Sequence, residues 1–135
     1  KVEYFGLDSS DYVVGRYGLA RDIRLCRFGD LEHQRFDRDF DLLICSDVLH
    51  YVPTRELLRG LEGFADLCPQ GFAFLELMCR GDDFVGDHEG FIARTAKFYR
   101  KAFAQAGFTA CGSHGYLSRA LREEASSLEL GARDP

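Results

Sequence analysis

The chain has 135 residues, 46% of them hydrophobic and 29% charged, with a net charge of −5 and a pI near 5.3. This length and composition are typical of one soluble globular domain with a single hydrophobic core. The acidic balance argues against binding to the phosphate backbone of nucleic acids, which requires a basic surface. No apolar run approaches the roughly 18 residues that a membrane-spanning helix requires, so the sequence predicts no membrane partner.

Cysteine and histidine usage indicates the compartment and argues against a bound metal. Five cysteines are scattered along the chain without a CxxC pair, and most of them lie in apolar runs. We therefore expect buried, reduced thiols in a cytoplasmic protein, and the chain opens without a signal peptide. The four histidines show neither HxxH nor HExxH spacing, so no metal held by the protein is predicted.

The first third of the chain predicts two strands and a weak helix. An apolar segment over residues 2–7 predicts a strand, and the polar cluster over residues 8–11 suits a strand end followed by a helix N-cap. Residues 12–20 predict a helix weakened by two glycines, and residues 23–28 predict a second strand. A loop is expected over residues 29–32.

The middle of the chain carries the strand around which the others are arranged. Residues 42–45 form an unbroken apolar run between Asp41 and a polar pair, a pattern typical of a strand buried on both faces. Residues 54–68 then predict an amphipathic helix, because apolar side chains recur there every three or four positions. Pro69 and Gly71 are expected to end this helix.

The remaining elements continue the alternation of strands and helices. We predict a strand over residues 72–78, a helix over residues 90–106, and strands over residues 108–113 and 126–130. Strands that alternate with helices indicate a parallel sheet with helices on its faces, so the predicted fold class is α/β.

Short motifs follow one another along this pattern: GLDSS after the first strand, GDLE after the second, FDLLICSDVLHYV around the central strand, then CPQG and QAGF. In this order and at these distances they resemble a class I S-adenosylmethionine-dependent methyltransferase, over nearly the whole chain from Val2 to about Leu130. The resemblance implies a Rossmann-like, mostly parallel sheet with helices on both faces. It also implies S-adenosyl-L-methionine as cofactor and S-adenosylhomocysteine as product.

The resemblance assigns two pairs of residues to the nucleoside part of the cofactor. It implies that Asp8, with Ser9 beside it, accepts hydrogen bonds from the ribose hydroxyls, since one carboxylate can accept both. A helix N-cap is the alternative role for Asp8. The resemblance further implies that Asp30 accepts from the exocyclic amine of adenine while Leu31 flanks the ring. An ordinary polar turn is the alternative for Asp30.

The end of the central strand is assigned to the centre of methyl transfer. The resemblance implies that Cys45 and Ser46 lie beside the methionine part of the cofactor. His50 and Tyr51 would line the substrate pocket, with His50 as the catalytic proton acceptor at neutral pH. A hydrogen-bonded packing residue is the alternative role for His50.

Three further residues lie on a segment that often helps to cover the substrate in this family, namely His88, Arg94 and Tyr99. We expect them in the substrate pocket. A solvated helix face is the alternative interpretation for each of them.

One element of the family pattern is missing from the 135 residues. The family's glycine-rich GxGxG loop does not occur, and the strand that carries it lies in the middle of the family's sheet. We therefore expect a single, N-terminally incomplete methyltransferase domain over residues 1–135, with an opening between the strand at residues 2–7 and the central strand.

The predicted function is methyl transfer from S-adenosyl-L-methionine to an O, N or S atom of a small molecule. Two alternatives remain open. One is a nicotinamide-dependent Rossmann oxidoreductase, in which Asp8 would hold the adenosine ribose. The other is a catalytically silent, methyltransferase-like subunit that binds a partner.

Overall fold

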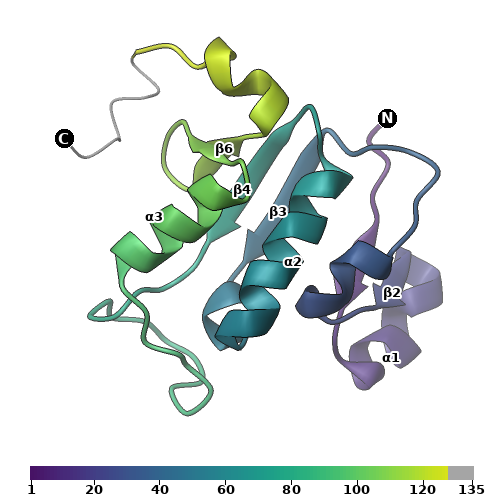
Figure 1. Cartoon of the computed structure of the whole chain (residues 1–135). Helices are drawn as coiled ribbons and strands as arrows, with labels where there is room; N and C mark the ends of the chain where they lie inside the picture. The colour runs from purple at the N-terminus through teal and green to yellow at the C-terminus, as the bar shows by residue number, and fades with distance from the viewer. Residues whose placement is uncertain (128–135) are drawn as a thin grey trace.

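The computed structural model describes residues 1–127 as two small sheets with helices packed beside them (Figure 1). In the first sheet, β1 (Gly6–Asp8) pairs in parallel with β2 (Ile23–Leu25). In the second, β3 (Leu42–Ser46) pairs in parallel with β4 (Phe72–Glu76). A helix lies between the two strands of each parallel pair along the chain, so the predicted α/β class is confirmed.

A short antiparallel hairpin completes the second sheet. β6 (Gly115–Leu117) pairs with β4 on one side and with β5 (Thr109–Ala110) on the other. The predicted strand over residues 108–113 is therefore reduced to two residues, and β6 is too short for its alternation to be detected in the sequence. After it comes a 3₁₀ helix, η3 (Arg119–Glu124). The strand predicted over residues 126–130 lies mostly outside the described residues.

The two sheets are separate. Within residues 1–127, β1 pairs only with β2, and β3 pairs with β4 but not with β1. Each of the strands β1 and β3 therefore has one edge without a strand partner. This is the arrangement that the expected opening beside the first strand requires.

The second sheet is covered on one face by two helices, α2 (Thr54–Leu67) and α3 (Ala96–Gln105) (Figure 1). The core is made of buried side chains from these helices and from the inward positions of β3 and β4, among them Leu43, Cys45, Leu57, Leu61, Phe64, Ala73, Leu75, Tyr99, Ala102 and Phe103. The helix predicted over residues 54–68 is confirmed almost to the residue.

The prediction that the central strand is buried on both faces is wrong. Along β3, Leu43 and Cys45 are buried, but Leu42 is 51% exposed and Ile44 is 67% exposed. The reason is that α2 and α3 cover the face on which Leu43 and Cys45 lie, and no helix of the described residues covers the other face. An apolar run in the sequence does not reveal how many faces of its strand receive a helix.

The first helix, α1 (Asp11–Arg21), confirms the weak helix predicted over residues 12–20. Its N-cap is Ser10, whose Oγ accepts a hydrogen bond from the N–H of Val13 at 3.2 Å. No residue of α1 is buried, which agrees with its lack of an apolar stripe.

The loop predicted over residues 29–32 is instead a 3₁₀ helix, η1 (Phe28–His33). It packs closely on α2, where two glycines face it. A Cβ added at Gly63 would lie 2.7 Å from the backbone nitrogen of Glu32, so only glycine leaves room for the η1 backbone. The contact that orders this segment is therefore a tertiary one.

The last long helix begins at Ala96 and not at Gly90 as predicted. Thr95 is its N-cap, with Oγ1 accepting from the N–H of Phe98 at 3.1 Å. Upstream, the N–H of Ile92 donates to the backbone carbonyl of His50 at 2.8 Å. This hydrogen bond ties the segment to another part of the chain and removes it from the helix.

Candidate functional site

A cavity of about 710 Å³ lies between β1 and β3. We call it the inter-sheet cavity. Asp8 and Ser9 line it from the end of β1, and Ser46 and Asp47 line it from the end of β3. Open α/β sheets bind their ligands at the carboxyl ends of parallel strands. The fold thus brings two polar strand ends, far apart in the sequence, to one opening.

The cavity also extends to the amino ends of the same strands. There it is lined by Phe5, Phe36 and Phe40, whose rings pack edge to face with centroids between 4.9 and 5.8 Å apart. Phe28 and Leu31 of η1 also line it. The wall of the cavity is therefore mainly aromatic and aliphatic, with the polar groups gathered at one end.

Four charged residues line the inter-sheet cavity: Asp8, Asp47 and Glu56 are acidic, and Arg27 is basic. Three carboxylates against one guanidinium leave the lining with an excess of two negative charges. Such a lining favours neutral or cationic ligands over anionic ones.

Asp8 is positioned by the turn between β1 and α1. Its Oδ1 accepts a hydrogen bond from the backbone N–H of Ser10 at 2.8 Å. The N-cap of α1 is Ser10 itself, so the capping role proposed as the alternative for Asp8 belongs to its neighbour. The second oxygen of Asp8, Oδ2, has no hydrogen-bond partner within residues 1–127 and remains available to a ligand.

The structure separates Asp30 from Leu31. Leu31 is buried and lines the inter-sheet cavity. Asp30 does not line it, and its Oδ1 lies 3.8 Å from Nη2 of Arg59 on α2. Both side chains of this pair are about half exposed, so the pair contributes little to stability. The assignment of Asp30 to the adenine ring therefore has no support from its position.

Cys45 and Ser46, which were assigned to the methionine part of the cofactor, both line the cavity. Burial raises the pKa of the Cys45 thiol to about 12, so this side chain stays protonated and is not a nucleophile at neutral pH. The hydroxyl of Ser46 donates to Oε1 of Glu76 at 2.6 Å, across the pair of parallel strands. Cys45 is thus a wall residue, and Ser46 is tied to the neighbouring strand end.

His50 lies in a single 3₁₀ turn, η2 (Leu49–Tyr51), and is completely buried. Its Nδ1 accepts a hydrogen bond from the backbone N–H of Met78 at 3.0 Å. Its Nε2 lies 3.1 Å from Oδ1 of Asp47, although the two are not aligned as in a completed hydrogen bond. Burial lowers the pKa of His50, and the nearby Asp47 carboxylate opposes this effect.

This lowered pKa makes stability depend on pH. Such a histidine is neutral in the folded state but can take up a proton once the chain unfolds. Its contribution to stability is therefore fully present above the unfolded-state pKa of 6.5 and is lost as the pH falls below that value. We expect the free energy of unfolding to fall as the pH drops below about 6.5, measured by urea denaturation at a series of pH values. His50→Gln should flatten that decline, whereas His33→Gln, at an exposed histidine, should leave it unchanged. An identical decline in both variants would contradict the prediction.

Of the five residues predicted for the substrate pocket, only Tyr51 lines the inter-sheet cavity, and the prediction for His50, His88, Arg94 and Tyr99 is not met. His88 is exposed, and its ring stacks on Phe84 with centroids 4.4 Å apart. Tyr99 is buried in the core, and its hydroxyl accepts from Nη1 of Arg94 at 2.9 Å. The structure does not bring His88, Arg94 or Tyr99 to the cavity.

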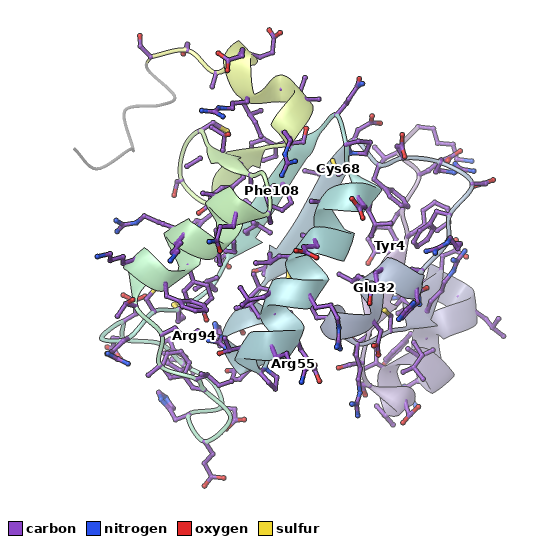
Figure 2. All side chains as sticks on the ribbon, viewed as in Figure 1. Tyr4, Glu32, Arg55, Cys68, Arg94 and Phe108 are labelled. Carbon is purple, nitrogen blue, oxygen red and sulfur yellow. The ribbon has the colours of Figure 1, made fainter. Side chains whose placement is uncertain are left out.

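Arg94 is a buried structural cation, so the alternative of a solvated helix face is wrong for it. It precedes α3 and lies near the amino end of α2 (Figure 2). Its guanidinium donates to the backbone carbonyls of Leu49 and Val52, to Oγ1 of Thr54 and to the hydroxyl of Tyr99. These hydrogen bonds join three segments of the chain around one side chain.

Asp47 and Glu56 line the cavity but were not predicted as site residues. Asp47 could have been recognised, because it directly follows the central strand, where ligands of α/β sheets bind. Glu56 lies in the first turn of α2, and nothing in its local sequence distinguishes it from an exposed helix residue.

Neither a scan against protein-family models nor a search of curated proteins finds a match to this chain. Within residues 1–127, no helix is long and apolar enough to cross a membrane. The same residues contain no group of three or more potential metal-binding side chains. The candidate site is therefore defined by its geometry alone.

Proposed function

We propose that the protein transfers a methyl group from S-adenosyl-L-methionine to a small molecule. The observation that carries this proposal is the inter-sheet cavity, at which the carboxyl ends of β1 and β3 present Asp8 and Asp47 to one opening. The resemblance of the sequence to class I methyltransferases supports a cofactor site at this end of the sheet.

The residues at the opening fit this cofactor. Asp8 has one carboxylate oxygen free of the Ser10 hydrogen bond, which can accept from a ribose hydroxyl. Phe28 and Leu31 offer an apolar wall for a flat base. When bound, the cofactor supplies a methyl group on a positively charged sulfur, and the excess negative charge of the lining suits that charge. The task left to the protein is to hold both reactants close and aligned.

The opening between β1 and β3 supports a finer statement about the fold. The cavity follows the strands from Phe5 and Phe40 at their amino ends to Asp8 and Asp47 at their carboxyl ends. A site for a small ligand alone would occupy only the carboxyl ends. We propose that the strand bearing the glycine-rich loop, which the 135 residues do not contain, stands in this opening and completes a Rossmann-like sheet.

Isothermal titration calorimetry of the full-length protein with S-adenosylhomocysteine and with NAD tests the proposal. We expect S-adenosylhomocysteine to bind, and Asp8→Ala to weaken that binding by about 10- to 1000-fold, because up to two charge-assisted hydrogen bonds are lost. Asp11→Ala is the matched control, since Asp11 lies in the first turn of α1 and does not line the cavity.

The titrations also separate the alternatives. Binding of NAD in place of S-adenosylhomocysteine would favour the oxidoreductase. Binding of neither compound by the folded protein would favour the catalytically silent subunit. An unchanged dissociation constant in a correctly folded Asp8→Ala variant would remove Asp8 from the cofactor site.

A further inference from the structure

Asp47 adopts a conformation that is rare for a residue with a side chain. Its φ is +59°, in the left-handed region, which only glycine, asparagine and aspartate enter with any frequency. Its backbone N–H donates to the carbonyl of Glu76 at 3.0 Å, which fixes the turn to the end of β4. The fold thus holds a carboxylate at the mouth of the inter-sheet cavity in a disfavoured backbone conformation.

His50 lies behind this carboxylate. Its Nδ1 accepts from the N–H of Met78, and a backbone amide can only donate. The neutral imidazole must therefore carry its proton on Nε2, which lies 3.1 Å from Oδ1 of Asp47. Asp47 provides the only ion-pair contact of His50 within residues 1–127.

This arrangement leaves His50 without a free basic nitrogen. The lone pair of Nδ1 is directed at the Met78 amide, and Nε2 already carries a proton. The rings of Tyr51, Phe84 and Phe91 pack around the imidazole, with centroids 4.3, 5.8 and 5.5 Å away. The buried imidazole is therefore suited to holding a neighbour and not to taking a proton from a substrate.

The polar atom that remains for a ligand belongs to Asp47. Its side chain is 59% exposed and lines the cavity. Only Oδ1 faces His50, and within the described residues Oδ2 has neither a hydrogen-bond nor an ion-pair partner. The carboxylate is therefore in contact with His50 on its buried side, is held in place by the backbone hydrogen bond of Asp47 to Glu76, and is open on its cavity side.

We propose that Asp47 is the hydrogen-bond acceptor for an amine group of the methyl acceptor, and that His50 is the positioning residue that holds Asp47. This inference rests on the proposed function and names its substrate class. Oδ2 accepts an N–H of the protonated amine and orients its nitrogen in the cavity, and the amine loses one proton to solvent water before its nitrogen attacks the methyl group. The excess negative charge contributed by Asp8, Asp47 and Glu56 favours an amine over an acid of the same size.

Two probes of equal size and opposite charge test the site without knowledge of the natural substrate. In an NMR titration of the full-length protein at pH 7, we expect propylamine to shift the backbone amide and side-chain carboxyl signals of Asp47. Propionate should not shift them. Asp47→Asn tolerates the left-handed backbone and keeps the shape of the side chain, and it should weaken propylamine binding by about 10- to 100-fold.

Asp66→Asn provides the matched control. Asp66 is exposed on α2 and does not line the inter-sheet cavity, so this variant makes the same change in net charge away from the site. It should bind propylamine like the wild type. An equal loss in both variants would mean that net charge, and not Asp47, binds the amine, which overturns the proposal.

A pair of variants tests the positioning role of His50. The longer amide in His50→Gln can still donate to Asp47, whereas the shorter one in His50→Asn can accept from the Met78 amide but cannot reach Asp47. We expect the glutamine variant to bind propylamine within a few-fold of the wild type and the asparagine variant to bind about as weakly as Asp47→Asn. Equal binding by both would overturn the positioning role.

The protonation state of His50 gives a readout that needs neither cofactor nor substrate. ¹⁵N spectra of the wild-type imidazole should show the proton on Nε2. A proton on Nδ1, or equal binding of propionate and propylamine, would overturn the proposal. If propylamine binds at Asp47 but S-adenosylhomocysteine does not bind at all, the methyltransferase function fails and the amine site stands.

Discussion

Arg94→Met should lower the free energy of unfolding by about 3–5 kcal/mol, because several buried acceptors would lose their donor at about 1–3 kcal/mol each, and these losses do not add fully. Methionine fills much of the same volume but donates no hydrogen bond. The carbonyls of Leu49 and Val52 and the hydroxyl of Tyr99 would then stay buried without the guanidinium. Urea denaturation followed by circular dichroism measures the loss.

Arg55→Met is the control for this substitution. Arg55 is exposed on α2 near the same end of the helix (Figure 2), so its replacement should change stability by less than about 0.5 kcal/mol. Tyr99→Phe removes one of the hydrogen bonds of Arg94 and should cost about 1 kcal/mol. If Arg94→Met were no more costly than Arg55→Met, the guanidinium would not be a structural link.

The second large loss of stability is expected when a glycine inside helix α2 is replaced. Gly60→Ala should destabilise the fold by about 2–4 kcal/mol, although alanine is the better helix former. A Cβ at this position would lie 2.2 Å from Cδ1 and 2.4 Å from the backbone oxygen of Phe28. A side chain can shift, but the backbone oxygen can move only if η1 separates from α2.

Gly15→Ala supplies the matched control, because it makes the same change within helix α1. A Cβ at Gly15 has no atom within 4 Å, so the free energy of unfolding of this variant should rise by about 0.5–1 kcal/mol from helix propensity alone. Opposite signs for the two variants in urea denaturation are the expected result. If Gly60→Ala were also more stable than the wild type, η1 would not be packed on α2 as described.

The elements that were predicted well are those whose evidence is local. The helix α2 is predicted almost to the residue, because its apolar side chains recur at helical spacing and Pro69-Gln70-Gly71 follows its end. The central strand and β4 are likewise located by their apolar runs. The short hairpin of β5 and β6 carries too few residues for any such pattern, and only its pairing with β4 defines it.

The residues of the candidate site also divide into those that local sequence evidence predicts and those whose contacts only the tertiary structure shows. Asp8, Ser9, Leu31, Cys45, Ser46 and Tyr51 were predicted and line the inter-sheet cavity. His50 was expected to line the substrate pocket, but it is completely buried and does not line the cavity, and its contacts with Met78 and Asp47 could not be predicted from the sequence. Arg94 was expected in a pocket and is buried as a structural link, because a sequence does not show which acceptors a cation will meet.

The sequence by itself determined α2, β3 and β4 and the polar residues that follow these strands, since each depends on neighbours a few positions away. It predicted the first strand over residues 2–7 and the second over residues 23–28, whereas β1 spans Gly6–Asp8 and β2 spans Ile23–Leu25. Tertiary structure alone decided that one face of β3 stays open, that Gly60 and Gly63 receive η1, and that His50 supports Asp47. Each of these depends on segments that are distant in sequence, and their contacts exist only once the core has packed.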